Sequence, residues 1–229
     1  MVNIIYEDNH LLIVEKPVNI PVQEDASQDI DLLRLLKNYL IKKYNKPGEA
    51  YLGLIHRLDR PVGGVMVFAK TSKAASRLSN QLRLQEIKRT YLTVVDHNFA
   101  ESSGKLTDYL FKDRQNNISY VVSPSKKGAK KAILNYNEIS KKNGRSLLKV
   151  QLQTGRSHQI RVQLSAAGHP IIGDQKYGQA VSEFDQQIAL WSYALEFTHP
   201  TKKEKMCFKS LPAPQSVWKD FAVILSQLK

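Results

Sequence analysis

Asp59 is a candidate for chemistry, because a carboxylate at the end of an expected strand and beside two cations is oddly placed for a core. It lies between two arginines, Arg57 and Arg60, in a segment expected to be a loop between strands at 51–55 and 65–69. Guanidinium groups favour the ionised form of a carboxylate if they are close enough to pair with it. The alternative is an aspartate that forms the turn by bonding to its own backbone, and spacing alone favours that structural role.

A second polar cluster lies at residues 153–161, where a glycine-containing turn leads into a helix expected at 157–167. Free N–H groups at the start of this helix could hold an anion, such as a phosphate or the Asp59 carboxylate. The two arginines of the cluster, Arg156 and Arg161, would add positive charge. The alternative is an ordinary capped helix with its arginines facing water, although Arg161 suits an ion pair at the edge of the apolar stripe.

The chain is strongly basic, with 34 lysines and arginines against 21 acidic residues and a net charge of +13. Such an excess fits a polyanionic partner, because neutralising phosphates supplies much of the affinity for nucleic acid. Four lysines gather in an expected hairpin turn at 123–131, namely Lys126, Lys127, Lys130 and Lys131. They are candidates to contact phosphate, and a solvated hairpin tip is the alternative.

Several classes of protein are disfavoured. The single cysteine, Cys207, cannot form a disulfide within the chain, and its apolar neighbours indicate a buried filler residue. The histidines at 56, 158 and 169 lack the spacing of a metal site, so no metal is expected. No signal peptide or membrane-spanning stretch is apparent, and we expect a cytoplasmic protein that is a monomer.

The elements that must position these residues predict an α+β domain, with a mixed, predominantly antiparallel sheet and flanking helices. Helices are expected at 29–44, 72–85, 157–167 and near 221–228, with Asp29 or Asp31 capping the first and Thr71 the second. A short strand is expected from residue 3 to the turn at 7–9, and further strands at 11–14, 51–55, 65–69, 89–95, 118–122, 132–139, 147–152 and 190–197. The length and the lack of a linker predict one domain over residues 1–229.

These residues also carry a family resemblance. His56-Arg57-Leu58-Asp59, followed by Gly64 and Ala69-Lys70, resembles the HRLD…G…AK signature of RluA-type RNA pseudouridine synthases. Further segments resemble the remaining motifs of that family and follow its order, at 6–17, 88–91, 154–161 and 168–178. The combination is specific, whereas each motif alone would be weak.

The resemblance implies a pseudouridine synthase fold with a central RNA-binding cleft. It implies isomerisation of uridine in ribosomal or transfer RNA, with Asp59 as the essential carboxylate, either as nucleophile or as the base that removes a sugar proton. Arg161 would be its ion-pair partner, and Tyr91 would stack on the target uracil. Arg57 would fill the space that the extruded base leaves, and His56 would contact a phosphate or orient the loop.

No redox change or external energy is needed for such an isomerisation, so no cofactor and no nucleotide are expected. Two departures from the family accompany the resemblance. Val62-Gly63 stands where relatives commonly carry Thr-Ser, which removes hydroxyls that could shape the loop. The small RNA-binding domain of some relatives is also expected to be absent. The rival interpretations are an RNA-binding protein without catalysis and a metal-dependent hydrolase or nuclease.

Overall fold

The computed structural model describes residues 2–96, 101–178 and 187–228. The chain divides into two compact units. Unit 1 comprises Met1–Arg89 and Ser192–Ser210, and unit 2 comprises Thr90–Trp191 and Leu211–Lys229. Both contain segments that carry the family resemblance, so the single catalytic domain over residues 1–229 stays a prediction.

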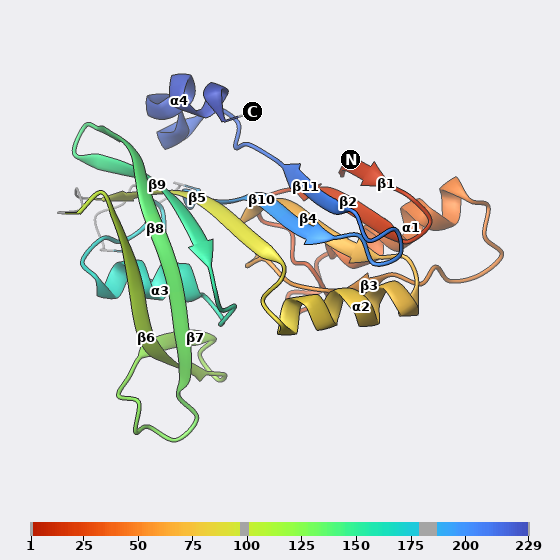
Figure 1. Ribbon diagram of the computed structural model, residues 1–229, viewed down its shortest axis with the longest axis horizontal. Helices are drawn as coiled ribbons and strands as arrows, with labels where there is room; N and C mark the ends of the chain where they lie inside the picture. The colour runs from red at the N-terminus through yellow and green to blue at the C-terminus, as the bar shows by residue number, and fades with distance from the viewer. Residues whose placement is uncertain (1, 97–100, 179–186, 229) are drawn as a thin grey trace. The chain divides into compact units, whose positions relative to one another are not determined.

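Unit 1 is a sheet with two α-helices (Figure 1). Its strands run in the order β1-β2-β4-β10, with β11 paired to β10 and β3 paired to β4. The elements are β1 (Asn3–Glu7), β2 (Leu11–Lys16), α1 (Leu32–Lys43), β3 (Gly53–Leu54), β4 (Gly63–Ala69), α2 (Ser72–Arg83), β10 (Leu190–Thr198) and β11 (Lys205–Lys209).

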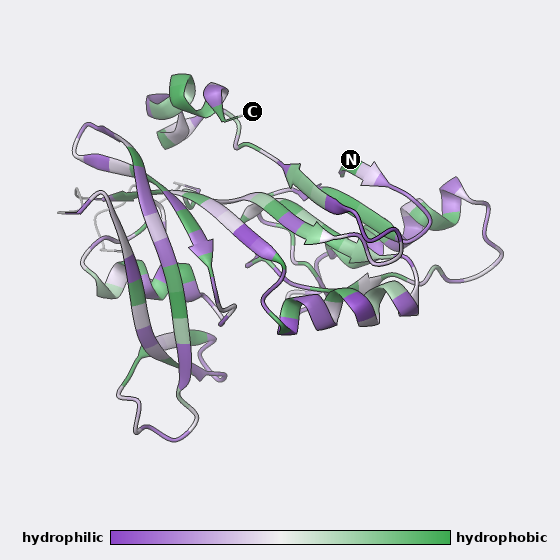
Figure 2. Cartoon of the chain, in the orientation of Figure 1, coloured by the Kyte–Doolittle hydropathy of each residue, from purple (hydrophilic) through white to green (hydrophobic). Residues whose placement is uncertain are grey.

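Strand β4 is the centre of unit 1, because all seven of its residues are buried. Odd-numbered residues of β2 and β4, such as Leu11 and Val67, pack with Ala74 and Leu78 of α2. Even-numbered residues face the other side of the sheet, as the strand period of two requires. In Figure 2 these strands are largely hydrophobic in colour, whereas α2 is mainly hydrophilic. The sequence pattern of a buried strand followed by an amphipathic helix therefore forms as expected.

Both predicted helix starts in unit 1 are confirmed. Asp31 caps α1 by accepting a hydrogen bond from the backbone N–H of Arg34, and Thr71 caps α2 by accepting one from Ala74. The predicted strand at 51–55 shortens to Gly53–Leu54. The burial expected for Cys207 is wrong, because its side chain is exposed. On β11 the neighbouring residues 206 and 208 turn towards the protein, so the strand alternation turns Cys207 outwards.

Unit 2 is a long twisted sheet whose strands run in the order β5-β9-β8-β6-β7. Its pairings β9–β8, β8–β6 and β6–β7 are antiparallel. The elements are β5 (Lys88–Asp96), β6 (Ser103–Asp113), β7 (Ile118–Val121), β8 (Lys130–Lys142), β9 (Arg145–Leu152), α3 (Gln159–Ala166), η1 (Ser216–Phe221) and α4 (Ala222–Gln227).

These elements confirm the α+β class and the predominance of antiparallel pairing. Strands β6 and β11 were not among the predicted ones. No helix among the described residues is both long and apolar enough to cross a membrane.

Candidate functional site

The Asp59 loop joins β3 to β4 in unit 1. Along it, Leu58 and Val62 are buried, whereas Arg57 is exposed and Asp59 is partly exposed. The backbone N–H of Val62 donates to the Asp59 carbonyl at 3.0 Å and closes a turn. The apolar residues thus anchor a tight loop in which Asp59 stays partly exposed.

Lys16, the last residue of β2, holds the same loop through hydrogen bonds to backbone carbonyls, a role that our sequence analysis missed. Its side chain is fully buried, and its Nζ donates to the carbonyls of Pro17, Arg60 and Val62, each at 2.9 Å. Burial lowers the pKa of Lys16 to about 7; the negative charge of Asp59 opposes this shift and the positive charge of Arg60 adds to it. One buried ammonium therefore fixes the backbone immediately after Asp59 and lies within electrostatic reach of its carboxylate.

The hydrogen bonds of Lys16 matter because Val62-Gly63 stands where members of the family commonly carry Thr-Ser, whose hydroxyls could shape the loop. The loop gains a restraint from the Lys16 hydrogen bonds and from the buried Val62 side chain, neither of which needs a hydroxyl. Gly64, the next residue, has φ +118°, and a Cβ there would lie 2.2 Å from the Ser192 carbonyl oxygen. Only glycine fits this position, because the β10 backbone occupies the space of a side chain.

The two arginines beside Asp59 differ in their surroundings. Arg60 turns towards the 25–29 segment, where it donates to Ser27 Oγ at 2.8 Å and forms ion pairs with Asp25 and Asp29. Arg57 is exposed and makes no hydrogen bond or ion pair with any residue that the structure describes. Of the two arginines, Arg57 is therefore the one that is available to a ligand.

His56 lies on the buried side of the loop, only 7% exposed. Its Nε2 accepts a hydrogen bond from the backbone N–H of Val67 at 3.3 Å. Burial, reinforced by the positive charge of Arg89, lowers the pKa of His56 to about 3, so the ring is neutral at physiological pH. Of the two roles that the resemblance implies for His56, this environment supports orientation of the loop.

In unit 2, Arg161 is held by a partner that the sequence analysis did not assign. Arg161 lies on α3, and its Nε and Nη2 donate to the two carboxylate oxygens of Asp174 at 2.8 and 2.7 Å. Both side chains are buried, with exposures of 5% and 0%. Asp174 also accepts from the backbone N–H groups of Lys176 and Tyr177, at 2.9 and 3.2 Å. The Arg161 guanidinium is thereby fixed in one orientation.

Tyr177 completes this network. The Arg161 guanidinium carbon lies 5.3 Å from the centre of the Tyr177 ring, a cation–π distance. The Tyr177 hydroxyl accepts from the backbone N–H of Ser119 at 2.7 Å and lies 2.7 Å from His158 Nδ1. Burial raises the pKa of Tyr177, so the hydroxyl keeps its proton and can donate it to the ring nitrogen. The motifs at 154–161 and 168–178 thus meet in one buried cluster.

The start of α3 shows how Arg156 is placed. His158 precedes the helix in the left-handed region, with φ 54° and no capping side chain. The Gln159 side chain instead accepts from the Arg156 backbone N–H at 2.9 Å, while Arg156 Nε donates to the Lys131 carbonyl at 2.9 Å. Arg156 therefore ties α3 to the start of β8.

The four lysines of the predicted basic turn are all exposed, in the β7–β8 loop and at the start of β8. Lys126 Nζ lies 4.7 Å from the centre of the Phe111 ring. Tyr91, by contrast, is a buried residue of β5, with 6% of its surface exposed. Asp59 belongs to unit 1, whereas Tyr91 and Arg161 belong to unit 2. A joint site of these three residues stays a prediction.

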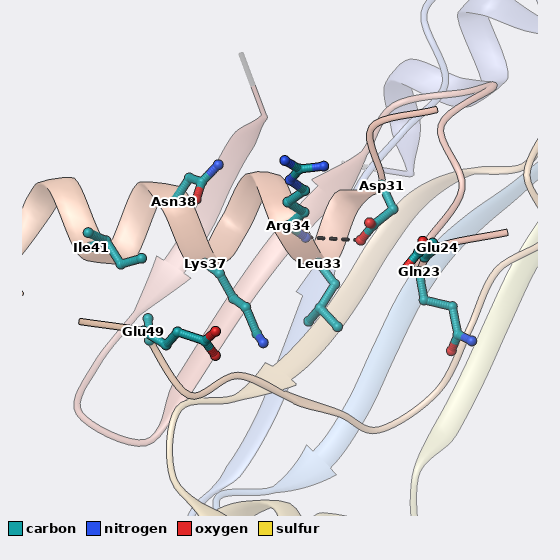
Figure 3. Close-up of a pocket in the computed structure, with 10 residues that line it drawn as sticks. Gln23, Glu24, Asp31, Leu33, Arg34, Lys37, Asn38, Ile41 and Glu49 are labelled. Atoms are coloured by element: carbon teal, nitrogen blue, oxygen red, sulfur yellow. Dashed lines mark hydrogen bonds between the residues drawn. The ribbon is translucent and has the colours of Figure 1, made fainter. Parts of the chain in front are cut away.

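A hollow of about 740 Å³ lies beside α1 in unit 1 and contains none of the predicted site residues (Figure 3). Its lining mixes both charges, with the cations Arg34 and Lys37 and the acidic residues Glu24, Asp31 and Glu49. The Asp31 carboxylate is occupied as the α1 cap. Among the described ranges, no three histidine, cysteine or acidic side chains gather closely enough to hold a metal ion.

Comparison with known proteins places the chain in a family. Residues 10–166 match the family model described as RNA pseudouridylate synthase. The chain belongs to the RNA pseudouridylate synthase family. The matched range contains Asp59, Tyr91 and Arg161, and it confirms the resemblance that the sequence motifs indicated.

Individual relatives agree with this assignment. The chain is similar to the ribosomal large subunit pseudouridine synthase C of Buchnera aphidicola, with 33% identity over 90% of this chain and 66% of the relative. It is also similar to the ribosomal large subunit pseudouridine synthase D of Neisseria meningitidis, with 31% identity over 97% of this chain and 61% of the relative. The chain thus spans somewhat less than two thirds of the length of these relatives.

A solved structure confirms the fold. The chain is similar to the structure titled Human RNA Pseudouridylate Synthase Domain Containing 4, with a TM-score of 0.78 and 21% sequence identity. The match covers 99% of this chain and 92% of the human chain. The pseudouridine synthase fold predicted from the motifs is therefore correct.

Proposed function

We propose that this chain is an RNA pseudouridine synthase that isomerises uridine within a structured RNA, with Asp59 as its essential carboxylate. The observation that carries the proposal is the family match over residues 10–166, which includes every motif from the Asp59 loop to Arg161. The fixed geometry of the Asp59 loop supports it further, because catalysis requires a carboxylate held in one position.

The reaction breaks the bond between the ribose and the ring nitrogen, rotates the base, and forms a carbon–carbon bond to the same sugar. Atoms and electrons balance without an oxidant or a cofactor. Asp59 would act either by attacking the sugar or by removing one of its protons. Arg161 would pair with Asp59 and hold it ionised, and Tyr91 would stack on the uracil.

The target uridine must first leave its stack, at a cost of a few kcal/mol. Arg57, exposed and without an ion pair among the described residues, would fill the vacated space. His56 would position the loop through its bond to Val67. Arg156 and the lysines at 126, 127, 130 and 131 would hold backbone phosphates, which predicts binding that weakens as salt rises.

Large-subunit ribosomal RNA is the substrate that we propose, because two relatives are named as ribosomal large subunit pseudouridine synthases. Transfer RNA is the competing substrate. The proposal places the protein in the cytoplasm and has it act as a monomer without a cofactor.

The test maps pseudouridine across total RNA from cells with and without the protein, and then repeats the reaction with the purified chain and a large-subunit ribosomal RNA transcript. We expect at least one uridine to depend on the protein. Asp59→Asn should remove detectable product while RNA affinity stays within about twofold, and Asp220→Asn, a partly exposed aspartate of unit 2, should behave as wild type. RNA binding by the wild type with no changed uridine would instead support a non-catalytic RNA-binding protein. Full activity of Asp59→Asn would remove this residue from the mechanism.

A further inference from the structure

An exposed face of unit 2 combines aromatic rings with lysines. It lies on the three-stranded part of the sheet formed by β7, β6 and β8 (Figure 1). Phe111 of β6 is opposite Tyr120 of β7, and Tyr109 of β6 is opposite Lys131 of β8. Because residues directly opposite or two apart share one face of a sheet, these four side chains lie on the same side.

The other side of these strands is the buried one. Leu110 and Ala132 pack there with Val162 of α3. The odd-numbered residues of β6 therefore project away from α3. Tyr120 is 46% exposed, and Tyr109 and Phe111 are half-buried.

The charge of this face is positive. Lys105 of β6 is opposite Asn135 of β8, and Lys149 of β9 is opposite Asn137 of β8. Because Asn135 and Asn137 lie on the same side of β8 as Lys131, Lys105 and Lys149 lie on this face as well. Lys126 reaches over the Phe111 ring from the β7–β8 loop. The acidic residue at the end of β6 on this side, Asp113, is occupied by hydrogen bonds from its own turn.

We propose that this aromatic face, made of Tyr109, Phe111 and Tyr120 with Lys126 and Lys131, is a stacking platform for unpaired nucleotides of the RNA. The choice of RNA as its occupant rests on the proposed function. Aromatic rings stack on any base because every base has a π-face, and flanking lysines neutralise the phosphates between successive bases. A duplex hides its base faces, so the platform selects single-stranded segments.

Tyr120 is the side chain that tests the platform, because it is exposed and its removal leaves the buried side of the sheet intact. The probes are fluorescent dodecauridine and an RNA duplex of about twelve base pairs, measured by anisotropy at fixed salt. The variants are Tyr120→Ala, Tyr120→Phe, which keeps the ring, and the control Tyr51→Ala, which removes a tyrosine of similar exposure (49% against 46%) in unit 1.

We expect Tyr120→Ala to weaken dodecauridine binding by about 5- to 150-fold, the equivalent of about 1–3 kcal/mol for one stacked base. Tyr120→Phe and Tyr51→Ala should bind as wild type, and duplex affinity should change by less than about twofold. Lys131→Gln should lower the slope of log affinity against log salt by about one, whereas Tyr120→Ala should leave that slope unchanged. Quenching of Tyr120→Trp fluorescence by dodecauridine would report stacking independently of the alanine variant.

Wild-type affinity of Tyr120→Ala for dodecauridine, or the absence of quenching in Tyr120→Trp, would overturn the platform. Equal losses for dodecauridine and duplex would also overturn it, since stacking distinguishes the two. Self-association that disappears in Tyr120→Ala with unchanged RNA affinity would assign the face to a second copy of the chain. If the chain forms pseudouridine but Tyr120→Ala leaves RNA affinity unchanged, only the platform is rejected. If RNA affinity depends on Tyr120 but the chain forms no pseudouridine, only the proposed function is rejected.

Discussion

The ion pair between Arg161 and Asp174 allows a prediction whose size follows from its burial. Asp174→Asn replaces a carboxylate that accepts two hydrogen bonds from Arg161. The exposures of 5% and 0% mean that water cannot replace the lost acceptor. Removing one partner of a buried pair costs ~3–5 kcal/mol, because the remaining charge stays desolvated. We expect the free energy of unfolding of Asp174→Asn to fall by this amount.

Tryptophan fluorescence in urea is the suitable assay. The chain has two tryptophans, Trp191 and Trp218, and both belong to unit 2, as does the ion pair. The control is Asp220→Asn, which breaks the pair between Arg145 and Asp220 at 3.9 Å, where the side chains are 36% and 29% exposed. Because that pair is hydrated and long, its loss should cost ~0–1 kcal/mol.

A double-mutant cycle separates the pair from the turn that Asp174 also holds. Asp174→Leu loses both the pair and the acceptor for two backbone N–H groups, whereas Arg161→Met with Asp174→Leu leaves no buried charge behind. The double variant should therefore be more stable than Asp174→Leu alone. A cost below ~1 kcal/mol for Asp174→Asn, or strict additivity in the cycle, would refute the view that Arg161 depends on Asp174. Under the proposed function the double variant should fold and yet form no pseudouridine, since it lacks the guanidinium that pairs with Asp59.

Much of the fold could be predicted because its signals are local. Asp31 and Thr71 cap helices through bonds to residues three positions later, which sequence spacing reveals directly. The fully buried strand β4 appears as an unbroken apolar run. Strand β6 was not predicted because its apolar residues do not alternate cleanly: Tyr109, Leu110 and Phe111 are consecutive.

The candidate site was predicted in its residues but not in its supports. The motifs indicated Asp59 and Arg161, whereas Lys16 and Asp174 came to light only in the structure. A buried lysine that donates to carbonyls 44 and 46 positions away leaves no periodic signal. The available clue was its position at the end of β2, where every residue except Glu15 is buried and an unpaired ammonium would be too costly to keep. The role of His56 likewise depends on its burial, which its place between the apolar Leu54-Ile55 and the charged Arg57 does not reveal.

Two further predictions concern pH and the buried charges of unit 1. Glu7 is buried, which opposes its ionisation, but donors on Lys43, Lys70, Tyr44 and Tyr39 lower its pKa to about 2 from 4.5. The stability that Glu7 contributes is thus present above pH 4.5 and lost as pH falls towards 2, so unfolding curves of wild type and Glu7→Gln should converge over this range; a constant difference would contradict the assigned hydrogen bonds. Lys16 has a pKa lowered by burial to about 7 from 10.5, so between these values the unfolded chain binds more protons than the folded one. Wild type should therefore gain up to ~1.4 kcal/mol per pH unit relative to Lys16→Met as pH rises from 7 towards 10. Because the ammonium also holds the carbonyls after Asp59, Lys16→Met should lower the rate of pseudouridine formation at pH 7 more than RNA affinity, and equal losses in both would argue against its role in positioning the loop.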